Sequence, residues 1–364
     1  MNTLRAAGMD PFPADVARDL SLAEVITQFD ALEQSGETRS IAARVTAIRG
    51  AGAIMFIVLD DGTAEFQAVL KKDEIDEAQF TLFQETVDMA DFVWLSGPCF
   101  TTERGQQSLL VKEWKMAGKA LLPLPDKWDG IQDQEEIYRK RYLQIATDRD
   151  VYNRYVMRAR VIGRIRQFLD EKGLLEIETP ILQNQAGGAM ARTFNTHHND
   201  YDMPMVLRIA LEIDHKMIMA GGYPGVYEFG KNFRNEGSDP THIQEFTMLE
   251  WYAAYHTLED NMNWTEELLK DVAENVVGSQ TFTVYDKDGN PTEVDFGGTW
   301  PRARFGDLVQ ENTGLDIATA SPEEIQNTAR EWGMSEEEIA NTGRANTLDF
   351  IYKKSSRNNI INPT

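Results

Sequence analysis

The feature that most constrains the fold is a change in the spacing of apolar residues along the chain. From about residue 39 to residue 116, apolar and polar residues alternate, so that Phe66, Ala68 and Leu70 share one face. Glycine-containing turns separate these alternating stretches, and a helical stretch over residues 74–83 interrupts them. The pattern predicts a small β-barrel of short strands with one inserted helix.

The 364 residues exceed what a single core usually organises, and the patterns divide them into four parts. We expect an N-terminal helical segment at residues 1–36 and a Greek-key barrel of the OB type at residues 37–117. Residues 118–136 are rich in proline and glycine, which indicates an interdomain linker. Residues 137–364 mix helices and strands without the regular alternation of a parallel sheet. This predicts an α+β domain around an antiparallel sheet.

The composition constrains the partners. Lys and Arg total 36 against 59 Asp and Glu, a net charge of −23, so RNA binding would need locally basic or aromatic surfaces. The presence of a single cysteine, Cys99, excludes an intramolecular disulfide and indicates a cytoplasmic protein. The apolar residues around Cys99 predict that its thiol is buried. No stretch has the ~20 apolar residues needed to span a bilayer, and no secretory signal is recognisable, so we expect no membrane association.

The most informative segment is a predicted hairpin over residues 233–252. A polar loop with Gly237 to Pro240 supplies the turn between two strands. Arg234 and Glu236 are two residues apart and are expected on one face of the first strand. Glu250 and Tyr252 are expected on one face of the second.

Two interpretations of this hairpin compete. An arginine such as Arg234 can grip a phosphate or a carboxylate, carboxylates can hold an ammonium group or a metal, and Phe246 could stack on a flat base. Alternatively, the opposite charges form cross-strand pairs on a surface hairpin, each worth under ~1 kcal/mol. The surrounding sequence favours the first interpretation.

Residues 233–237 (FRNEG), His242 and residues 245–252 (EFTMLEWY) together resemble motif 2 of the class II aminoacyl-tRNA synthetases in its lysyl form. Residues 173–180 (GLLEIETP) resemble motif 1, which ends in a proline, here Pro180, at the dimer interface. The resemblance extends from residue 10 to the C-terminus. It implies an OB-fold anticodon-binding domain, a class II catalytic domain and a homodimer. Further similar stretches are residues 139–145, 187–199 and 208–216.

The resemblance implies a lysine–tRNA ligase that uses ATP and Mg²⁺ in protein biosynthesis, with lysine and tRNA(Lys) as its other substrates. Arg234 would bridge the α-phosphate of ATP and the carboxylate of lysine. Glu236 and His242 would contact the nucleotide, and Phe246 would stack on adenine. Such chemistry needs positioning and charge neutralisation more than proton transfer.

The same resemblance implies an amino-acid pocket. Gly188 and Glu212 would hold the α-amino group of lysine, and Glu250 and Tyr252 would line the pocket for its side-chain ammonium group. Mg²⁺ would be held largely by ATP phosphates and carboxylates. We expect no metal ligands within this chain, because the resemblance puts the acidic ligands in the part of the family pattern past Thr364. The adjacent pair His197-His198 would point to opposite faces of a strand, which argues against a shared metal.

In the barrel, the resemblance implies that anticodon bases stack on Phe56 and are read by Gln67 and Glu113, with Arg49 nearby. Stacking contributes ~1–3 kcal/mol per base and needs no net positive charge, so it is compatible with the acidic composition. The alternative is that Phe56 is an ordinary core residue of the barrel.

This chain departs from the lysyl pattern at three places. Ile243-Gln244 replaces an expected Asn-Pro, and Leu211-Glu-Ile-Asp-His-Lys216 replaces Pro-Glu-Leu-Tyr-Leu-Lys. The family pattern also continues past Thr364 with motif 3, acidic Mg²⁺ ligands and a further glutamate for the substrate ammonium. We therefore expect a partial catalytic domain that activates lysine poorly.

Three other functions remain open at this stage. An RNA-binding paralogue without catalysis would fit the departures, although Arg234, Glu236 and Glu250 oppose it. A paralogue that lysylates a protein would lack the barrel. Aspartyl or asparaginyl specificity is opposed by Glu212 and Glu250, which favour a cationic substrate.

Overall fold

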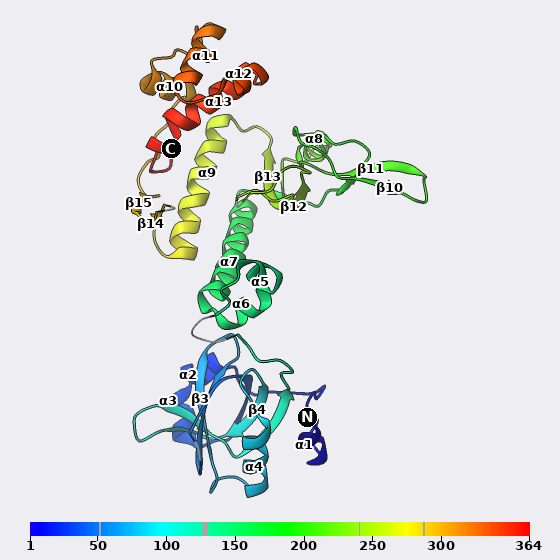
Figure 1. The fold of residues 1–364 in the computed structure, drawn as a ribbon, viewed down its shortest axis with the longest axis vertical. Helices are drawn as coiled ribbons and strands as arrows, with labels where there is room; N and C mark the ends of the chain where they lie inside the picture. Colours follow the sequence, from blue (N-terminus) through cyan, green and yellow to red (C-terminus); the bar gives the residue numbers. More distant parts are fainter. Residues whose placement is uncertain (51, 126–129, 240, 287) are drawn as a thin grey trace. The chain divides into compact units, whose positions relative to one another are not determined.

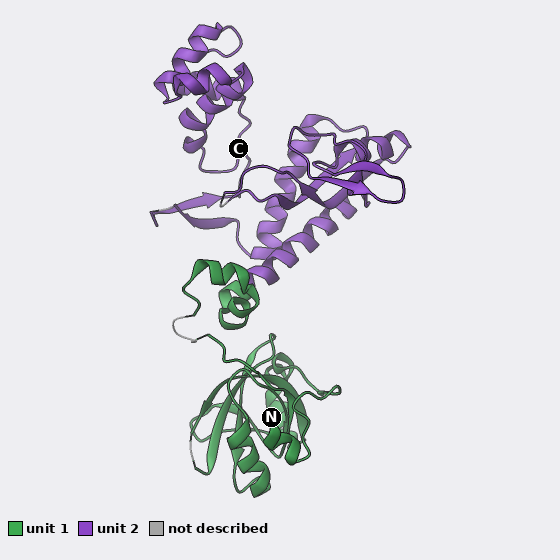
Figure 2. Cartoon of the chain, turned by 45° about the vertical axis from the view of Figure 1, so that its right-hand side comes forward, with its two compact units in different colours: residues 1–152 green, residues 153–364 purple. Residues whose placement is uncertain are grey.

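The computed structural model describes residues 1–50, 52–125, 130–239, 241–286 and 288–364. They form two compact units, residues 1–152 and 153–364 (Figure 2). The predicted division into residues 1–36, 37–117, 118–136 and 137–364 is finer than these units and stays a prediction. Part of the predicted linker, residues 126–129, and Pro240 of the predicted turn lie outside the described residues.

The first unit is built around a strongly curved sheet of seven strands (Figure 1). The sheet order is β5-β6-β3-β2-β1-β4-β7, and β4 continues into β5 after Pro98. Because β6 pairs with both β5 and β3, this continuation closes the sheet into a barrel. The predicted OB-type barrel is therefore confirmed. Its strands are β1 (Arg39–Arg49), β2 (Ile54–Asp60), β3 (Glu65–Lys71), β4 (Phe92–Gly97), β5 (Cys99–Thr101), β6 (Gln107–Leu110) and β7 (Glu113–Gly118).

One side of each strand fills the barrel. Phe66, Ala68 and Leu70 are buried in its core, as their alternation predicted. The inserted helix, α4 (Glu77–Thr86), begins at Asp76, whose carboxylate accepts hydrogen bonds from the backbone N–H groups of the first turn. The other helices of the unit are α1 (Asn2–Ala6), α2 (Leu22–Thr27), α3 (Phe29–Ser35), α5 (Gln134–Arg139) and α6 (Arg141–Thr147).

Cys99 is buried at the start of β5, as predicted. Burial, with a smaller contribution from the charge of Glu33, raises the pKa of its thiol to about 11. The thiolate is therefore scarce at neutral pH, and the side chain acts as a small apolar core group.

The carboxylate of Asp61 connects the N-terminal segment to the barrel through hydrogen bonds. Its carboxylate accepts hydrogen bonds from Thr63, from the backbone N–H of Leu22 and from Arg18 at 2.5 Å. Burial opposes ionisation, but these hydrogen bonds outweigh it and lower the pKa of Asp61 to about 2. A depressed folded-state pKa stabilises the fold above the unfolded-state pKa, and this contribution is lost as the pH falls toward 2.

We therefore expect Asp61→Asn to lower the free energy of unfolding of the barrel by ~1–2 kcal/mol at pH 7. The difference from the unaltered chain should shrink measurably by pH 3. Urea titrations at the two pH values measure it, with the exposed Asp73→Asn as the matched control. A difference that does not depend on pH would contradict the assignment.

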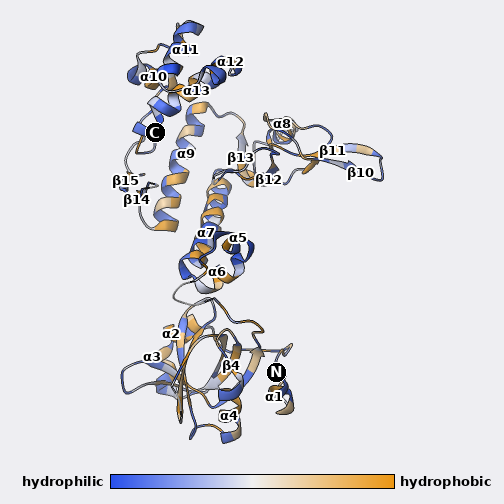
Figure 3. Cartoon of the chain, in the orientation of Figure 1, coloured by the Kyte–Doolittle hydropathy of each residue, from blue (hydrophilic) through white to orange (hydrophobic). Residues whose placement is uncertain are grey.

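The second unit begins within the long helix α7 (Arg149–Glu171), which packs with β12 and α9 around one core. Phe168 and Leu169 of α7, Tyr227 of β12 and Leu268 of α9 are its central side chains. Figure 3 shows hydrophobic residues recurring along α7 and α9 among hydrophilic ones. The strands are β8 (Leu175–Glu176), β9 (Leu182–Gln183), β10 (Asn195–His198), β11 (Met203–Leu207), β12 (Gly225–Phe233), β13 (Glu245–Ala253), β14 (Thr281–Tyr285) and β15 (Pro291–Asp295).

These strands form small sheets, in the orders β13-β12-β8, β10-β11-β9 and β14-β15. The pairings are antiparallel except that β8 runs parallel to β12. The α+β class is confirmed. The helices of this unit after α7 are α8 (Glu212–Ala220), α9 (Leu258–Val272), which continues as a π-helical turn over Ala273–Val277, α10 (Phe305–Thr313), α11 (Pro322–Glu331), α12 (Glu336–Asn341), α13 (Arg344–Ser355) and a 3₁₀ turn at Arg357–Asn359.

The C-terminal helices α10 to α13 enclose a hydrophobic core of their own (Figure 1). Val309, Ile325, Ala329 and Ile351 are its most buried members. No helix within the described residues is long and apolar enough to cross a membrane.

Candidate active site

The antiparallel pair β12 and β13 has one face that packs on α7 and α9 and one face covered by α8. In the pairing register, Val226 lies opposite Tyr252, Glu228 opposite Glu250, and Asn232 opposite Phe246. Opposed residues project to the same face of a sheet, so Phe246, Glu250 and Tyr252 share the face that α8 covers. The three hairpin residues predicted on the second strand are thereby placed together.

Arg234 lies at the end of β12, with its guanidinium carbon 5.2 Å from the centre of the Phe246 ring. Its Nε donates to the carbonyl of Ile209 at 3.4 Å, and its backbone N–H donates to Gln244 at 2.9 Å. The side chain is half-buried, so the cation is fixed but accessible. Arg234 and Phe246 are thus brought together as a cation–π pair.

The prediction that Arg234 and Glu236 share a strand face is wrong, because β12 ends at Phe233. The backbone N–H of Asn235 donates to the carbonyl of Arg192 at 2.9 Å, outside the hairpin. This contact with a distant segment ends the ladder and turns the chain into the loop. Glu236 therefore sits in the loop, where one of its carboxylate oxygens accepts the N–H of Arg192 at 3.4 Å.

His242 is exposed at the far side of the loop. Its Nδ1 is 2.8 Å from a carboxylate oxygen of Asp239. Hydrogen bonds from Thr241, followed by the contact with His242, lower the pKa of Asp239 to about 2. Within the described part of the loop, His242 makes no hydrogen bond or ring contact with Arg234 or Phe246.

The departure at Gln244 has a structural explanation. Its side-chain Nε2 donates to the backbone carbonyl of Glu236 at 2.8 Å and to the hydroxyl of Ser238 at 2.7 Å. These bonds tie the two sides of the loop together. A proline, which the lysyl pattern has here, could not make them.

Two carboxylates and a tyrosine, Glu212, Glu250 and Tyr252, form an acidic cluster. One oxygen of Glu250 accepts the hydroxyl of Tyr252 at 2.8 Å, and the other accepts the backbone N–H of Leu211 at 3.2 Å. Burial, the hydrogen bond to Glu250 and the charges of Glu250 and Glu212 all raise the pKa of Tyr252. The cluster therefore places the negative charges of Glu250 and Glu212 close to Tyr252.

Glu212 begins α8 and forms an ion pair with Lys216 at 2.6 Å. Gly188 lies against it in the left-handed region, with φ of +80°. A Cβ at residue 188 would fall 2.9 Å from the Cβ of Glu212 and 3.1 Å from that of Ala210. The position thus needs glycine for both its conformation and its space. Gly188 thus lies against Glu212, and the charge of Glu212 reaches Tyr252, which binds Glu250. The two roles predicted for these four residues stay predictions.

A buried polar network lies next to this cluster, because its member His215 packs against Tyr252. This network was not predicted. Glu228, 3% exposed, accepts hydrogen bonds from Thr179 at 2.7 Å and from Arg208 at 2.9 Å, and it contacts His215 Nε2 at 3.1 Å. Burial raises the pKa of Glu228, but the contacts with His215, Thr179 and Arg208 outweigh it, so the net shift is downward. The sequence signal was a glutamate in the apolar stretch VYEFG.

Pro180 follows Thr179 and is exposed. The next two residues, Ile181 and Leu182, are 40% and 48% exposed. This segment therefore presents apolar groups at the surface of the second unit.

In the barrel, Arg49 lies opposite Phe56, and Val58 lies opposite Gln67. The alternation of β2 places Phe56 outside the barrel, where it is 37% exposed, so the core interpretation of Phe56 is wrong. Gln67 donates to the hydroxyl of Ser108 on β6 at 2.8 Å. Arg49, Phe56 and Gln67 thus share one outer face.

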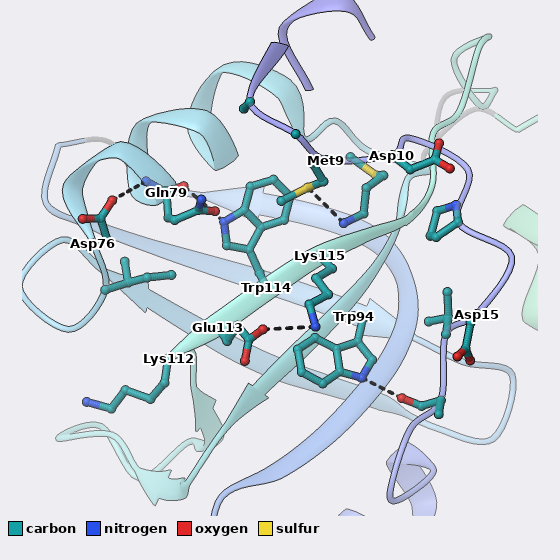
Figure 4. Close-up of a pocket in the computed structure, with 17 residues that line it drawn as sticks. Met9, Asp10, Asp15, Asp76, Gln79, Trp94, Lys112, Glu113, Trp114 and Lys115 are labelled. Carbon is teal, nitrogen blue, oxygen red and sulfur yellow. Dashed lines mark hydrogen bonds and ion pairs between the residues drawn. The ribbon is translucent and has the colours of Figure 1, made fainter. Parts of the chain in front are cut away.

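Glu113 lies elsewhere on the barrel, on β7 opposite Ser96 of β4. It pairs with Lys115 at 3.1 Å, and the Lys115 ammonium group lies 4.7 Å from the centre of the Trp94 ring (Figure 4). These residues line a cavity of about 730 Å³ between residues 7–17 and the barrel. The sequence did not indicate this cavity.

Among the described residues, no three His, Cys, Asp or Glu side chains are placed to hold a metal ion. In particular, His197 contacts Asp202 while His198 contacts Tyr201, so the adjacent histidines have separate partners.

Comparison with known proteins assigns both units to families. Residues 133–351 match the family described as tRNA synthetases class II (D, K and N), and residues 40–117 match the OB-fold nucleic acid binding domain. A lysine–tRNA ligase of Chloroflexus aurantiacus is 38% identical over 99% of this chain and 72% of its own length. Those of Thermotoga maritima and Lactococcus lactis subsp. lactis are each 37% identical, over 99% and 100% of this chain and 71% and 74% of their own lengths.

Proposed function

Because the chain belongs to the class II tRNA synthetases, in the group of the lysine–tRNA ligases, we propose that it joins lysine to tRNA(Lys) through a lysyl-adenylate made from ATP. The observation that carries this proposal is the acidic cluster of Glu212, Glu250 and Tyr252, on the sheet side that also holds Phe246, the partner of Arg234. We take this cluster to form the acidic pocket that binds lysine. The pocket suits a cationic side chain, and the pair suits a phosphate next to a flat base.

In the activation step, a carboxylate oxygen of lysine attacks the α-phosphorus of ATP and pyrophosphate leaves. We propose that Arg234 neutralises both the attacking carboxylate and the α-phosphate; its contacts with Phe246 and Ile209 support this role because they hold the guanidinium in one position. Phe246 offers a face for adenine, with Glu236 and His242 contacting the nucleotide from the loop. The proposed step requires no general base, because the attacking group is already ionised.

Selection of lysine follows from charge. Glu250 and Glu212 favour an ammonium group and repel the acidic side chain of aspartate. The neutral amide of asparagine would give Glu250 no counter-charge, whereas Glu212 already pairs with Lys216. Gly188 allows the backbone to lie close to Glu212, with which we propose it binds the α-amino group.

We propose that Mg²⁺ arrives with the phosphates of ATP. The described residues offer no set of ligands that would hold a metal alone, and no step is derived through it.

The exposed segment at Pro180, Ile181 and Leu182 supports a homodimer with this segment in the interface. A single buried cysteine is consistent with the proposed cytoplasmic location.

On the barrel, we propose that the face with Arg49, Phe56 and Gln67 binds the anticodon, with Glu113 as a further contact from β7. Phe56→Ala is expected to weaken binding of a tRNA(Lys) anticodon stem-loop by ~1–3 kcal/mol, because one stacking platform is lost. Fluorescence anisotropy measures the affinity at a fixed salt concentration.

The matched control is Phe92→Ala. Phe92 lies on β4 of the same barrel, and its side chain is 40% exposed against 37% for Phe56. Unlike Phe56, Phe92 packs under the guanidinium of Arg44 on β1. Its replacement should leave RNA affinity within about twofold. Equal losses in the two variants would rule out a specific role for Phe56.

The function as a whole is tested by ATP–pyrophosphate exchange. The purified chain is assayed with lysine, aspartate and asparagine, and Arg234→Ala sets the background. Exchange above background with lysine alone is the expected result. Exchange with aspartate or asparagine in preference to lysine would overturn the proposed specificity, and no lysine-dependent exchange would overturn the proposed activity of this chain.

A further inference from the structure

His215 is a fully buried histidine on α8, the helix that begins with Glu212. Residues three apart on a helix are neighbours on its surface, so His215 lies on the same side of α8 as Glu212. Its Nε2 is 3.1 Å from Glu228, and among the described residues its Nδ1 has no hydrogen-bond partner. A buried histidine with one polar contact must be held there by that contact and by packing.

The partner of His215 is itself rigidly held. Arg208 binds the other oxygen of Glu228 and also donates to the backbone carbonyls of Lys231 and Thr179, both at 2.9 Å. Arg208 is 2% exposed, and a Cβ on Gly230 would fall 2.4 Å from its guanidinium. Glu228 is thus a fixed point on β12, and His215 connects α8 to it.

The other side of the His215 ring faces the acidic pocket. The ring packs edge-on against Tyr252, with centres 5.3 Å apart and an interplanar angle of 72°. Tyr252 donates to Glu250, and Glu250 accepts the N–H of Leu211 at the start of α8. These contacts therefore form a closed ring. His215 connects α8 to β12, β12 pairs with β13, and Glu250 of β13 binds the start of α8.

We propose that His215 is a positioning residue for the ammonium pocket, acting through Glu228 and Tyr252. It fixes the start of α8, and with it Glu212, relative to Glu250. This inference rests on the proposed function, because it takes the pocket to be the lysine site. The lysyl pattern that this segment resembles has leucine at residue 215, and a leucine could not make the contact with Glu228.

The test measures binding of lysine and of ATP separately, by calorimetry on the full chain. His215→Leu replaces the imidazole with an apolar side chain of similar volume, so the packing is retained but the contact with Glu228 is removed. We expect the Kd for lysine to rise ~10-fold, because a charge-assisted hydrogen bond that orients the pocket is lost, with the Kd for ATP unchanged within twofold. His215→Gln, whose amide can place a donor near the Nε2 position, should restore lysine affinity to within about threefold.

A matched control is His197→Leu on the exposed β10–β11 hairpin, which should change neither affinity. If His215→Leu fails to fold, His215→Asn replaces it, since its shorter amide cannot reach Glu228. Equal loss of lysine and ATP affinity, or unchanged lysine affinity in the removal variant, would overturn the positioning role while leaving the proposed function intact. An unaltered chain that binds no lysine would overturn both.

Discussion

Arg208→Ala is expected to lower the free energy of unfolding of the 153–364 unit by about 3–5 kcal/mol, a large fraction of the stability of an ordinary domain. The substitution leaves Glu228 ionised and buried without its main counter-charge. It also removes the donors to the carbonyls of Lys231 and Thr179. The uncompensated buried charge and the unsatisfied carbonyls both lower the free energy of unfolding.

Urea unfolding followed by tryptophan fluorescence measures this effect, because Trp251, Trp264 and Trp300 all lie in this unit. The matched control is Arg158→Ala, an exposed arginine on α7, which should change stability by less than ~0.5 kcal/mol. Similar losses in the two variants would mean that the buried network contributes little. Arg208→Ala with Glu228→Gln should recover part of the loss, because the buried charge is then absent.

The barrel and the hairpin were predictable because local patterns determine them. Alternation in β3 correctly places Phe66, Ala68 and Leu70 in the core, and Gly237 to Asp239 lie between the two hairpin strands as predicted. The face of β13 that holds Glu250 and Tyr252 follows from their spacing of two.

The buried network could not be predicted, because its members come from four separate segments. Thr179, Arg208, His215 and Glu228 meet only once β12 has paired with β13 and α8 has docked. In a single sequence, a glutamate in an apolar strand resembles an outward-facing residue. Its partners are decided by tertiary packing.

The end of β12 was missed for a related reason. Arg234 and Glu236 have strand-like spacing, but the backbone at Asn235 bonds to Arg192, more than forty residues earlier in the chain. For the C-terminal helices, in contrast, the sequence does contain local signals for where they begin. Ser321 with Glu324 and Ser335 with Glu338 form capping boxes that mark the starts of α11 and α12.

Arg234→Ala is expected to weaken binding of a non-hydrolysable lysyl-adenylate analogue by ~100-fold, which corresponds to ~2.7 kcal/mol. We propose that the positive charge of the guanidinium faces the phosphate; the group is held by the ring of Phe246 and the carbonyl of Ile209. Calorimetry on the analogue isolates binding from turnover, so the result does not depend on the rate at which this chain activates lysine.

The control comes from the opposite face of the same sheet, because Arg166 of α7 packs over Phe229 of β12 at 4.8 Å. Arg166 also pairs with Glu176. Arg166→Ala removes an equal charge and an equivalent cation–π contact, yet it should leave analogue affinity within about threefold. If both variants lose affinity equally, the effect is one of net charge or hairpin stability, and Arg234 is not the phosphate-binding residue. If only Arg234→Ala loses it, the face that α8 covers is the one that binds the adenylate.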